Sequence, residues 1–376
     1  MIKIKRDLEK IIKRHKAFVS LKDMEGPLLC INILGNDLAA SYEKTFAGIP
    51  RDREVRPQDI DLDIFLEEAR HYILLHEEIG LDSIYSVEPY FWIPWMEAIM
   101  GCPIYAGKNS FYSEHFIGDW KSFDWEIDLS GENAWLQKLL SMSEALVEAF
   151  GDKYPISSST HLRGPADMMS AALGQKRFPL EIYDNPEEIK KLCDICTDAF
   201  IDVAGRSNRI ASGAKFKGST VNYFGIWTED VCQYYQDDAV VFLSPEFYRE
   251  FILESHLKID RNFPSTFYHN HPVSLYVVEE LIRFPNLRMI EIDRELEAIG
   301  PSLEEMIPAC RKIQDHGKAL IINFGETDFD EDFIEYETKA AFENLSSKGL
   351  CIYICAGDIE DGLRKAGAVN NIFKIF

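Results

Sequence analysis

The stretch Leu350-Cys-Ile-Tyr-Ile-Cys-Ala-Gly-Asp358 is an apolar run that ends in a cysteine and a carboxylate. Three earlier runs have the same form: Ser265-Thr-Phe-Tyr-His-Asn-His271, Leu287-Arg-Met-Ile-Glu-Ile-Asp293 and Ala319-Leu-Ile-Ile-Asn-Phe-Gly-Glu326. The segments between the runs are long enough for a crossover helix, which gives the βα repeat of a parallel sheet. Reactive side chains at the carboxyl end of each strand are typical of the active face of a TIM barrel. The pattern therefore predicts an enzyme with a (β/α)8 TIM barrel. It also predicts that the active site lies at the carboxyl ends of the strands.

Length and charge narrow the class of protein further. The chain has 376 residues, which suits one barrel with an added N-terminal segment. We assign residues 1–60 to an N-terminal helical arm that packs on the barrel, and residues 61–376 to the barrel. The net charge is −23, from 63 acidic and 40 basic residues. A field of that sign repels phosphate backbones and anionic lipids, so we expect no nucleic-acid partner and no membrane binding.

The sequence also predicts a cytoplasmic location. No segment reaches the ~18 consecutive apolar residues of a transmembrane helix, and no apolar core of a secretory signal follows the first charged residues. The eight cysteines are scattered over a large chain and should be reduced in the cytoplasm. Cys193 and Cys196 form a C-x-x-C pair, but they fall in a predicted helix without a second pair. Two packed helical cysteines are therefore favoured over a redox or zinc site.

Periodicity and stop signals predict the other elements of the chain. Helices are expected at 63–79, 132–150 and 186–204, and candidate strands at 82–87, 154–159 and 221–226. Residues 239–243 are apolar, but the run is short. Ser244 followed by Pro245 is a good start for a further helix, because serine caps the first turn and proline suits its first position.

His269 and His271 are the sharpest local feature. Residues i and i+2 of a strand point to the same face, so both imidazoles would lie at the mouth of the barrel. Two imidazoles can hold zinc at ~2.0–2.1 Å if a third ligand converges on the ion, and Cys355 near its own strand end is the candidate. Three protein ligands and one open position are the form of a catalytic zinc site. The alternative is a pair of histidines that hydrogen-bond a substrate without metal.

Two further segments offer substrate contacts. The loop that carries Glu88, Tyr90, Trp92 and Trp95 is aromatic and broken by prolines; it would either form an aromatic wall for a flat ligand or pack on the barrel. The turn Arg163-Gly-Pro165 precedes an apolar helix, so its free N–H groups would hold an anion, with His161 and Arg163 as contacts. The alternative for the turn is a capped helix start with an exposed arginine.

Polar residues at the ends of the later strands are the candidates for proton transfer. Glu291, Asp293 and Glu326 are the possible general bases, and Asn323 is a possible substrate contact. Some of these groups must instead cap the helices that follow the strands. Spacing alone does not separate a base from a cap.

Several motifs together resemble the uroporphyrinogen decarboxylase superfamily. They are Trp95-Met-Glu-Ala-Ile-Met-Gly-Cys-Pro103, Gly164-Pro165 before a helix, Leu243-Ser-Pro-Glu-Phe-Tyr248, the His269 strand with Ile290-Glu-Ile-Asp293, and the closing Cys355-Ala-Gly-Asp358. The resemblance runs over most of the chain from about residue 60. It implies a TIM barrel that is either a decarboxylase or a zinc methyltransferase. The second branch moves a methyl group from a methylated corrinoid protein to a thiol.

The two branches of the superfamily fit this sequence unequally. True decarboxylases carry an Arg-Gln-Ala-Gly-Arg motif and a Phe-Ser-Asp strand end. The motif is missing here, and the strand end reads Tyr85-Ser-Val87, with Glu88 as the nearest carboxylate. The methyltransferases hold zinc with His-x-Cys and a late cysteine. By that resemblance His269 matches the histidine, His271 replaces the first cysteine and Cys355 lies where the late cysteine is expected.

The resemblance favours a corrinoid-dependent methyltransferase. It would move a methyl group from a methylated corrinoid carrier protein to a small acceptor, assisted by zinc at His269, His271 and Cys355. The aromatic residues from Tyr90 to Trp95 would meet the corrinoid or a second cofactor. The alternatives are a decarboxylase of a tetrapyrrole-type substrate and a non-catalytic relative that binds a tetrapyrrole or corrinoid.

Overall fold

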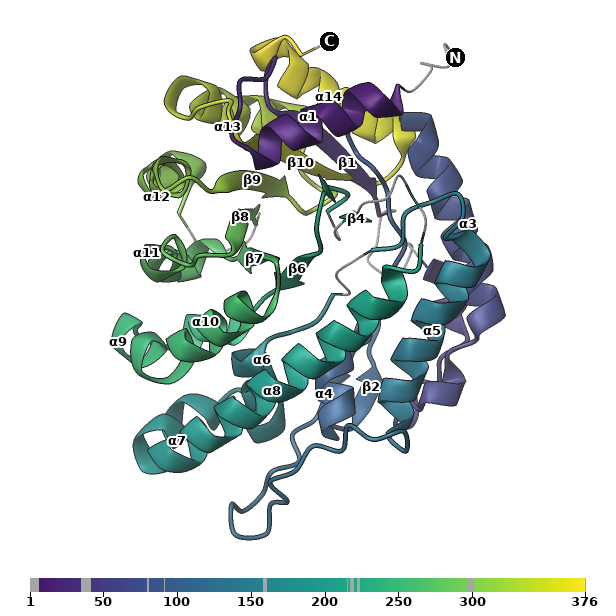
Figure 1. The fold of residues 1–376 in the computed structure, drawn as a ribbon, viewed down its shortest axis with the longest axis vertical. Coiled ribbons are helices and arrows are strands. Elements are labelled where there is room, and N and C mark those ends of the chain that lie inside the picture. The colour runs from purple at the N-terminus through teal and green to yellow at the C-terminus, as the bar shows by residue number, and fades with distance from the viewer. Residues whose placement is uncertain are drawn as a thin grey trace.

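A computed structural model describes most of the chain. The described residues are 7–34, 42–79, 81–90, 92–157, 161–214, 216, 220–221, 224–295 and 301–375. The centre of the fold is a parallel sheet of six strands in this described part, in the order β1-β10-β9-β8-β7-β6. Its strands are β1 (Leu28–Ile33), β6 (Cys232–Tyr235), β7 (Ser265–Asn270), β8 (Leu287–Arg294), β9 (Ala319–Phe324) and β10 (Leu350–Ala356). Helices surround the sheet (Figure 1).

The last four strands are the ones that the sequence predicted. β7, β8, β9 and β10 pair in parallel and in chain order, each with the next. Their apolar runs are buried on both sides, since helices cover one face and the interior of the fold covers the other. The strand–helix rhythm of the last third of the chain is therefore confirmed.

The sheet is strongly curled. The ring of Phe224 contacts Phe267 of β7 at 5.1 Å and Tyr353 of β10 at 4.8 Å between ring centroids. β7 and β10 are separated by two other strands, so one ring reaches both only if the sheet bends around it. A TIM-barrel-like fold places its site at the carboxyl-terminal mouth of this packed interior.

The expected closed barrel of eight regular strands is not what the described residues form. Between β1 and β6 the barrel wall consists of extended segments rather than regular strands. Their described residues form isolated parallel bridges, Val87 with Ile156 and Arg163 with Gln236. The predicted strand at 82–87 thus makes a single bridge, and part of the one predicted at 154–159 lies outside the described residues. Pro155 has no N–H to give to a ladder, which limits pairing here. The fold is a curled half-barrel.

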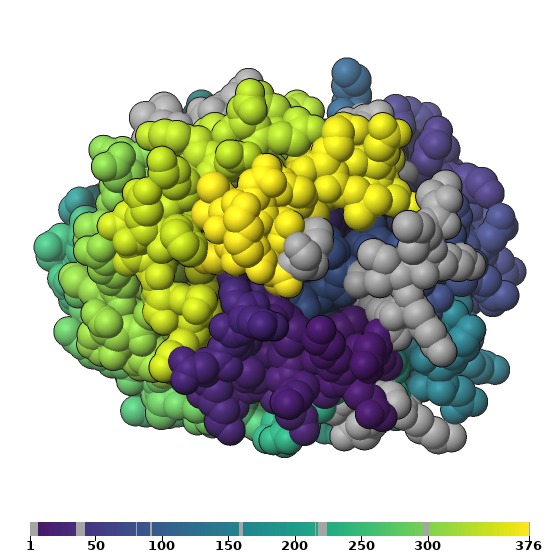
Figure 2. Space-filling view, turned by 90° about the horizontal axis from the view of Figure 1, so that it is seen from above, coloured from purple at the N-terminus to yellow at the C-terminus, as the bar shows by residue number. Residues whose placement is uncertain are grey.

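The N-terminal region is part of the sheet rather than an arm that lies against it. β1 pairs with β10 in parallel from Leu28 opposite Cys351 to Ile33 opposite Ala356. The chain before β1 forms α1 (Leu8–Val19), which lies beside the C-terminal helix α14 (Ile359–Phe373), as Figures 1 and 2 show. A Cβ on Gly26 would stand 2.9 Å from Cγ1 of Ile375, so the two ends of the chain pack closely.

The three predicted helices are present: those at 63–79 and 132–150 match closely, and the one at 186–204 continues to Ala211. The α-helices are α1, α2 (Glu43–Ala47), α3 (Leu62–Ile79), α4 (Trp95–Met100), α5 (Ala134–Phe150), α6 (Pro165–Leu173), α7 (Phe178–Asp184), α8 (Pro186–Ala211), α9 (Pro245–Phe247), α10 (Leu253–Asn262), α11 (Val278–Leu281), α12 (Leu303–Asp315), α13 (Glu331–Asn344) and α14. Shorter 3-10 turns are η2 (Pro57–Asp59), η3 (Asp238–Phe242) and η5 (Pro272–Val277), and η4 (Tyr248–Ile252) is a π-helical turn. Among the described residues no helix is long and apolar enough to cross a membrane.

Local details of these helices follow the sequence signals. The Ser244 side chain accepts a hydrogen bond from the Phe247 N–H at the start of α9, as its position predicts. Cys193 and Cys196 lie buried in α8, and all eight cysteines, each in the described part, are free thiols.

Two apolar runs in the middle of the chain do not form strands of the parallel sheet, as far as the structure describes them. Residues 239–243 fall largely in the 3-10 turn η3, and the strand that precedes it is β6. Of the candidate strand at 221–226, residues 222–223 lie outside the described residues; Val221 belongs to β4 (Thr220–Val221), which pairs antiparallel with β5 (Trp227–Thr228). A second small hairpin, β2 (Ile104–Ala106) with β3 (Phe111–Ser113), follows α4.

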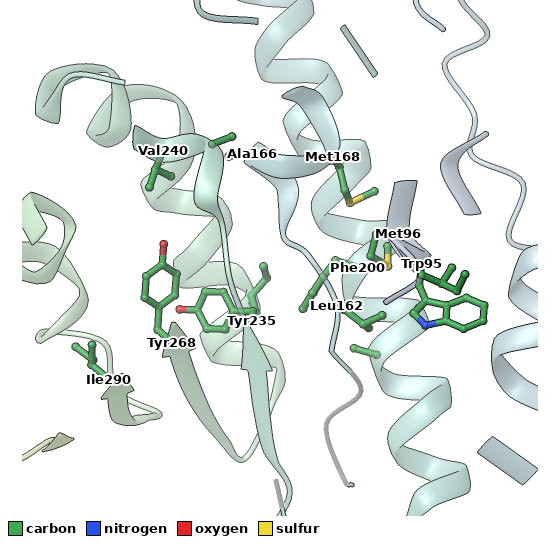
Figure 3. Close-up of a cluster of buried hydrophobic side chains, with 14 of the residues drawn as sticks. Trp95, Met96, Leu162, Ala166, Met168, Phe200, Tyr235, Val240, Tyr268 and Ile290 are labelled. Atoms are coloured by element: carbon green, nitrogen blue, oxygen red, sulfur yellow. The ribbon is translucent and has the colours of Figure 1, made fainter. Parts of the chain in front are cut away.

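The two faces of the curled sheet bury different side chains. Tyr235 and Tyr268 lie on the outer face, under the helices, with ring centroids 5.0 Å apart (Figure 3). Tyr234 and Phe267, their neighbours in sequence, lie on the inner face with centroids 5.5 Å apart. Because side chains alternate along a strand, His269 shares the inner face with Phe267.

Candidate metal centre

His269 and His271 meet at the carboxyl end of β7. The two Nε2 atoms stand 3.1 Å apart, with ring centroids 4.6 Å apart and ring planes nearly perpendicular. His269 is the penultimate residue of β7, and His271 directly follows the strand. The two imidazoles therefore come together on the inner side of the sheet, as their spacing in the sequence suggests.

Each imidazole is held from behind by its own carboxylate. Glu291 lies opposite His269 on the neighbouring strand β8, and its Oε2 bonds the Nδ1 atom of that ring. Glu295, just past the end of β8, does the same for Nδ1 of His271. A carboxylate at Nδ1 fixes that nitrogen as the N–H donor and leaves the Nε2 lone pair for another partner. Both lone pairs then face the same small volume.

Asp238 supplies the third group. Its Oδ1 lies 3.2 Å from Nε2 of His271 and 4.0 Å from Nε2 of His269. It follows β6, the strand beside β7, so it reaches the same edge of the sheet. Its other oxygen accepts a hydrogen bond of 2.8 Å from Nε2 of Gln236. The sequence reasoning missed Asp238 because it identified no strand at 232–235; two aspartates directly after Cys232-Gln-Tyr-Tyr-Gln236 were the available signal.

The spacing of these three groups fits a shared metal ion. Two ligand atoms at ~2.0–2.1 Å from a tetrahedral zinc stand about 3.3 Å apart. The measured separations are 3.1, 3.2 and 4.0 Å, and one ligand atom from each of Asp238, His269 and His271 lies within 4.8 Å of the others. A second group, His271 with Asp293 and Glu295, meets the same limit. Nitrogen and carboxylate ligands are a set that zinc accepts.

Without metal, the electrostatics of this cluster favour a charged His271. Burial alone would lower its pKa, but hydrogen bonds and charges from Asp238 and Glu295 raise that pKa to about 11. Burial would raise the pKa of Asp238, and the facing imidazoles hold it well below its usual value instead. Burial opposes a charged His269, yet the Glu291 carboxylate still raises its pKa. The cluster thus holds a cation, and a proton fills that role when no metal does.

Cys355 is not brought together with the two histidines. It is buried on the inner face of β10, at 5% exposure, and belongs to neither ligand group found among the described residues. β10 lies three strands from β7 in the sheet, roughly 14 Å along it at ~4.8 Å per strand. Burial raises the pKa of its thiol, and the nearby Asp293 carboxylate raises it further. The third group that faces the two imidazoles is therefore Asp238, whereas the sequence suggested Cys355.

Asp293 and Asn323 lie opposite each other on β8 and β9, next to the cluster. One oxygen of each has no hydrogen-bond partner among the described residues, and the same holds for Oε1 of the fully buried Glu291. Burial and the Glu291 charge raise the pKa of Asp293 to about 8. A Cβ on Gly325 would stand 2.7 Å from Oδ1 of Asp293, so glycine allows the chain to pass this carboxylate closely. Glu326 follows β9 and is partly buried.

The turn at the start of α6 already contains a carboxylate. Asp237 Oδ1 accepts the Asp167 N–H at 2.9 Å, and a Cβ on Gly164 would stand 2.7 Å from Asp237 Oδ2. An N–H group of this turn therefore already bonds a side chain of the protein itself, so it is not free for an outside anion as the sequence suggested. His161 bonds Oε1 of Gln236 at 2.5 Å, which links it to Asp238 through one side chain.

Arg163 and Glu88 have well-defined partners near this turn. Arg163 Nη1 donates to Oε1 of Glu97 at 3.3 Å, while about half of its side chain stays exposed. Glu88 accepts the His161 N–H at 2.8 Å, and burial raises the pKa of its carboxyl to about 8.

The aromatic segment packs mainly in the core. Tyr90 and Trp95 are at most 1% exposed, and the Trp95 Nε1 donates to the Tyr90 carbonyl at 3.1 Å. Trp95 lies near Met96 in the buried cluster of Figure 3. Trp92 is partly buried. Of the two interpretations of this loop, packing on the fold describes Tyr90 and Trp95.

A cavity of about 930 Å³ opens beside the cluster. Arg163, Asp167 and Asp238 line it on the side of the strand ends. The other walls are β3 with the segment that follows it to Gly118, the C-terminal end of α6, and η3. Asp238 thus belongs both to the two-histidine cluster and to the cavity wall.

Comparisons with known proteins inform the fold. No protein-family model matches the chain, and no curated protein matches its sequence. Among solved structures the chain is similar to a B12-independent methionine synthase from Shewanella sp. W3-18-1, solved with selenomethionine. The TM-score is 0.52 at 11% sequence identity, and the match covers 93% of this chain and 97% of the other. A likeness at this identity concerns the fold alone and agrees with a TIM-barrel-like architecture.

Proposed function

We propose that this protein is a metal-assisted methyltransferase of the uroporphyrinogen decarboxylase superfamily that acts on a small acceptor. One observation carries the proposal: Nε2 of His269, Nε2 of His271 and Oδ1 of Asp238 converge at the carboxyl edge of the sheet, beside a cavity. Both Nδ1 atoms are bonded to carboxylates, so each ring can present the lone pair of its Nε2 atom to a metal. Zinc is the metal that the donor set suits best.

Each residue has a role that follows from its position. His269, His271 and Asp238 would hold the ion, and Glu291 and Glu295 would orient the two rings. When bound, zinc supplies a Lewis acid that lowers the pKa of an acceptor such as a thiol. Asp293, Asn323 and Glu326 lie at the same edge and would position the acceptor or take its proton.

The proposed reaction is a displacement at the methyl carbon. The acceptor sulfur forms the new bond to carbon, and the bond between the methyl group and its donor breaks with the electron pair leaving on the donor. The thiol proton passes to a carboxylate, for which Asp293 is the nearest candidate to the cluster. The protein itself would hold the two reactants in line. Such positioning can lower the activation free energy by ~7–11 kcal/mol.

The methyl donor is a separate part of the proposal. The sequence resemblance favours a methylated corrinoid on a carrier protein. The structural neighbour is described as B12-independent, so it gives the corrinoid no support. A methyl-transfer assay should therefore include both a methylated corrinoid and a corrinoid-free methyl donor, with a simple thiol as acceptor.

The alternative reaction, decarboxylation of a tetrapyrrole-type substrate, has weaker support. The residue where decarboxylases place their aspartate is Val87, which is buried and bridges Ile156. An apolar side chain there leaves pyrrole N–H groups without their acceptor. Turnover of uroporphyrinogen in the usual range of ~1–10³ per second would favour the alternative, and zinc-dependent thiol methylation would favour our proposal.

A further inference from the structure

We propose that the cavity beside the cluster binds the acceptor, and that this acceptor carries an anionic group, such as a carboxylate, which Arg163 binds. This inference rests on the proposed function, because it concerns the substrate of the same site. It adds the chemical class of the substrate and the residue that selects it.

The cavity has the size and composition of a small-molecule site. Its volume of about 930 Å³ lies within the ~300–1,000 Å³ of typical ligand pockets. Apolar side chains such as Ile117, Leu173 and Phe242 line part of it, and charged groups gather where it meets the strand ends. An acceptor with an apolar body and one charged end fits this division.

Arg163 is anchored in a way that leaves donors for a ligand. Glu97, its ion-pair partner, has 0% exposure, and it bonds a single guanidinium nitrogen at 3.3 Å. The Arg163 side chain is 48% exposed and lines the cavity. A guanidinium has five N–H donors in a planar fork that matches a carboxylate. Held by Glu97 on one side, the fork is positioned to bind an anion on the other.

Arg163 also lies at the right place relative to the proposed metal ligands. It is bridged across the sheet to Gln236, and Asp238 follows Gln236 by two residues. The cavity wall contains both Arg163 and Asp238. A ligand held at its anionic end by Arg163 can therefore extend toward the two-histidine cluster with its reactive end.

Three carboxyl groups also line the wall, those of Glu114, Asp167 and Asp238, and the last two have partners of their own. The Asp238 carboxylate faces His271, and Oδ1 of Asp167 accepts the Ala239 N–H at 2.7 Å. Arg177 bonds Glu181 and the Gly118 carbonyl. Lys176 forms no ion pair among the described residues, so it adds a second cation to the cavity.

The test compares two ligands that differ in one charge. 3-Mercaptopropionate and 3-mercaptopropanamide are titrated calorimetrically into the metal-free and the zinc-loaded protein. We expect the carboxylate to bind about ten-fold more tightly than the amide, and the preference to shrink at high salt. Equal affinity for the two ligands, or no binding of either compound to either form, would overturn the inference.

Variants assign the preference to Arg163. Arg163→Ala alone would leave the buried Glu97 charge without a partner and risks unfolding. The double variant Arg163→Gln with Glu97→Gln removes both charges and should lose the preference, and Arg163→Lys should keep only part of it. Arg249→Ala is the matched control, since Arg249 also pairs with one glutamate and is 49% exposed, but it does not line the cavity.

The outcomes separate this inference from the proposed function. A preference for the carboxylate that persists without zinc binding supports the anion site while the metal proposal fails. Zinc binding with no charge preference supports the metal centre and refutes the anion site. A preference that survives in the double variant would show that a group other than Arg163 binds the anion.

Discussion

The Nε2 atoms of His269 and His271 stand 3.1 Å apart, while the Nδ1 atom of each ring bonds a separate carboxylate. With both Nδ1 atoms protonated, two lone pairs would face each other across that distance. A cation between them removes the repulsion, and Asp238 adds a negative charge to the same volume. The arrangement therefore requires either a shared proton or a metal ion, and the choice between the two decides the function.

Replacement of Asp238 should weaken zinc binding more than replacement of Cys355. Asp238→Ala removes an oxygen 3.2 Å from Nε2 of His271, and we expect the zinc dissociation constant to rise at least ~10–100-fold. Cys355→Ser should change it little, because the thiol lies on a strand three positions away in the sheet. Competition with a coloured chelator measures both. The opposite order would identify the late cysteine as the ligand.

The carboxylates behind the histidines should tune the affinity without being ligands. Glu291→Gln and Glu295→Gln keep a hydrogen-bond acceptor at each Nδ1 but remove its charge. Outer carboxylates of this kind typically contribute ~10–100-fold in metal affinity. We therefore expect weaker zinc binding with an unchanged number of zinc ions per chain, measured by titration and elemental analysis. Unaltered affinity in both variants would mean that the rings are not metal ligands.

Trp95 should matter for stability rather than for ligand binding. It is 1% exposed and packs edge-to-face on Trp135, with ring centroids 6.0 Å apart. Trp95→Ala should lower the free energy of unfolding by ~3–5 kcal/mol, as loss of a buried large aromatic does. Trp92→Ala, at a partly buried position, should cost less. Urea denaturation gives both values, and a fully stable Trp95→Ala protein would contradict its place in the core.

Glu88 should make the stability depend on pH. Burial raises its pKa in the folded protein from the usual 4.5 to about 8, so the folded state holds a proton that the unfolded chain releases. The stabilisation from this proton is complete below about pH 4.5 and is lost as pH rises to about 8, by up to ~1.4 kcal/mol per pH unit.

The variant Glu88→Gln tests this pH dependence directly. The substituted amide would keep an acceptor for the His161 N–H without a charge. The advantage in stability of this variant over the natural protein should therefore grow between pH 5 and pH 8, measured by chemical denaturation. Glu78→Gln, at an exposed site, serves as the control. A constant difference across that range would show that Glu88 is ionised in the folded state.

Part of the fold was predictable because its strands are buried on both sides. The runs that became β7 to β10 are continuous apolar segments separated by helix-length intervals, and such segments leave few alternatives. Leu28–Ile33 is just as apolar and became β1, but nothing in its neighbourhood indicated that its partner is β10 at the other end of the chain. Pairing between distant segments depends on tertiary packing, which local pattern does not encode.

The candidate site shows the same division. The i, i+2 spacing of His269 and His271 was enough to place both rings together once the strand had formed. The spacing did not determine whether the two rings point into the interior or away from it. That orientation depends on whether Phe267 or Tyr268 faces the interior. Asp238 was missed because β6, which contains Gln233 and two tyrosines, lacks the continuous apolar run that indicates a buried strand.

The zinc content of protein purified without chelator tests the central claim most directly. We predict about one zinc per chain, lost in His269→Ala and His271→Ala and retained in His316→Ala, an exposed histidine bonded only to the Lys312 carbonyl among the described contacts. Zinc-free protein that also fails to bind added zinc would contradict the account. An unchanged zinc content in His271→Ala would contradict it equally.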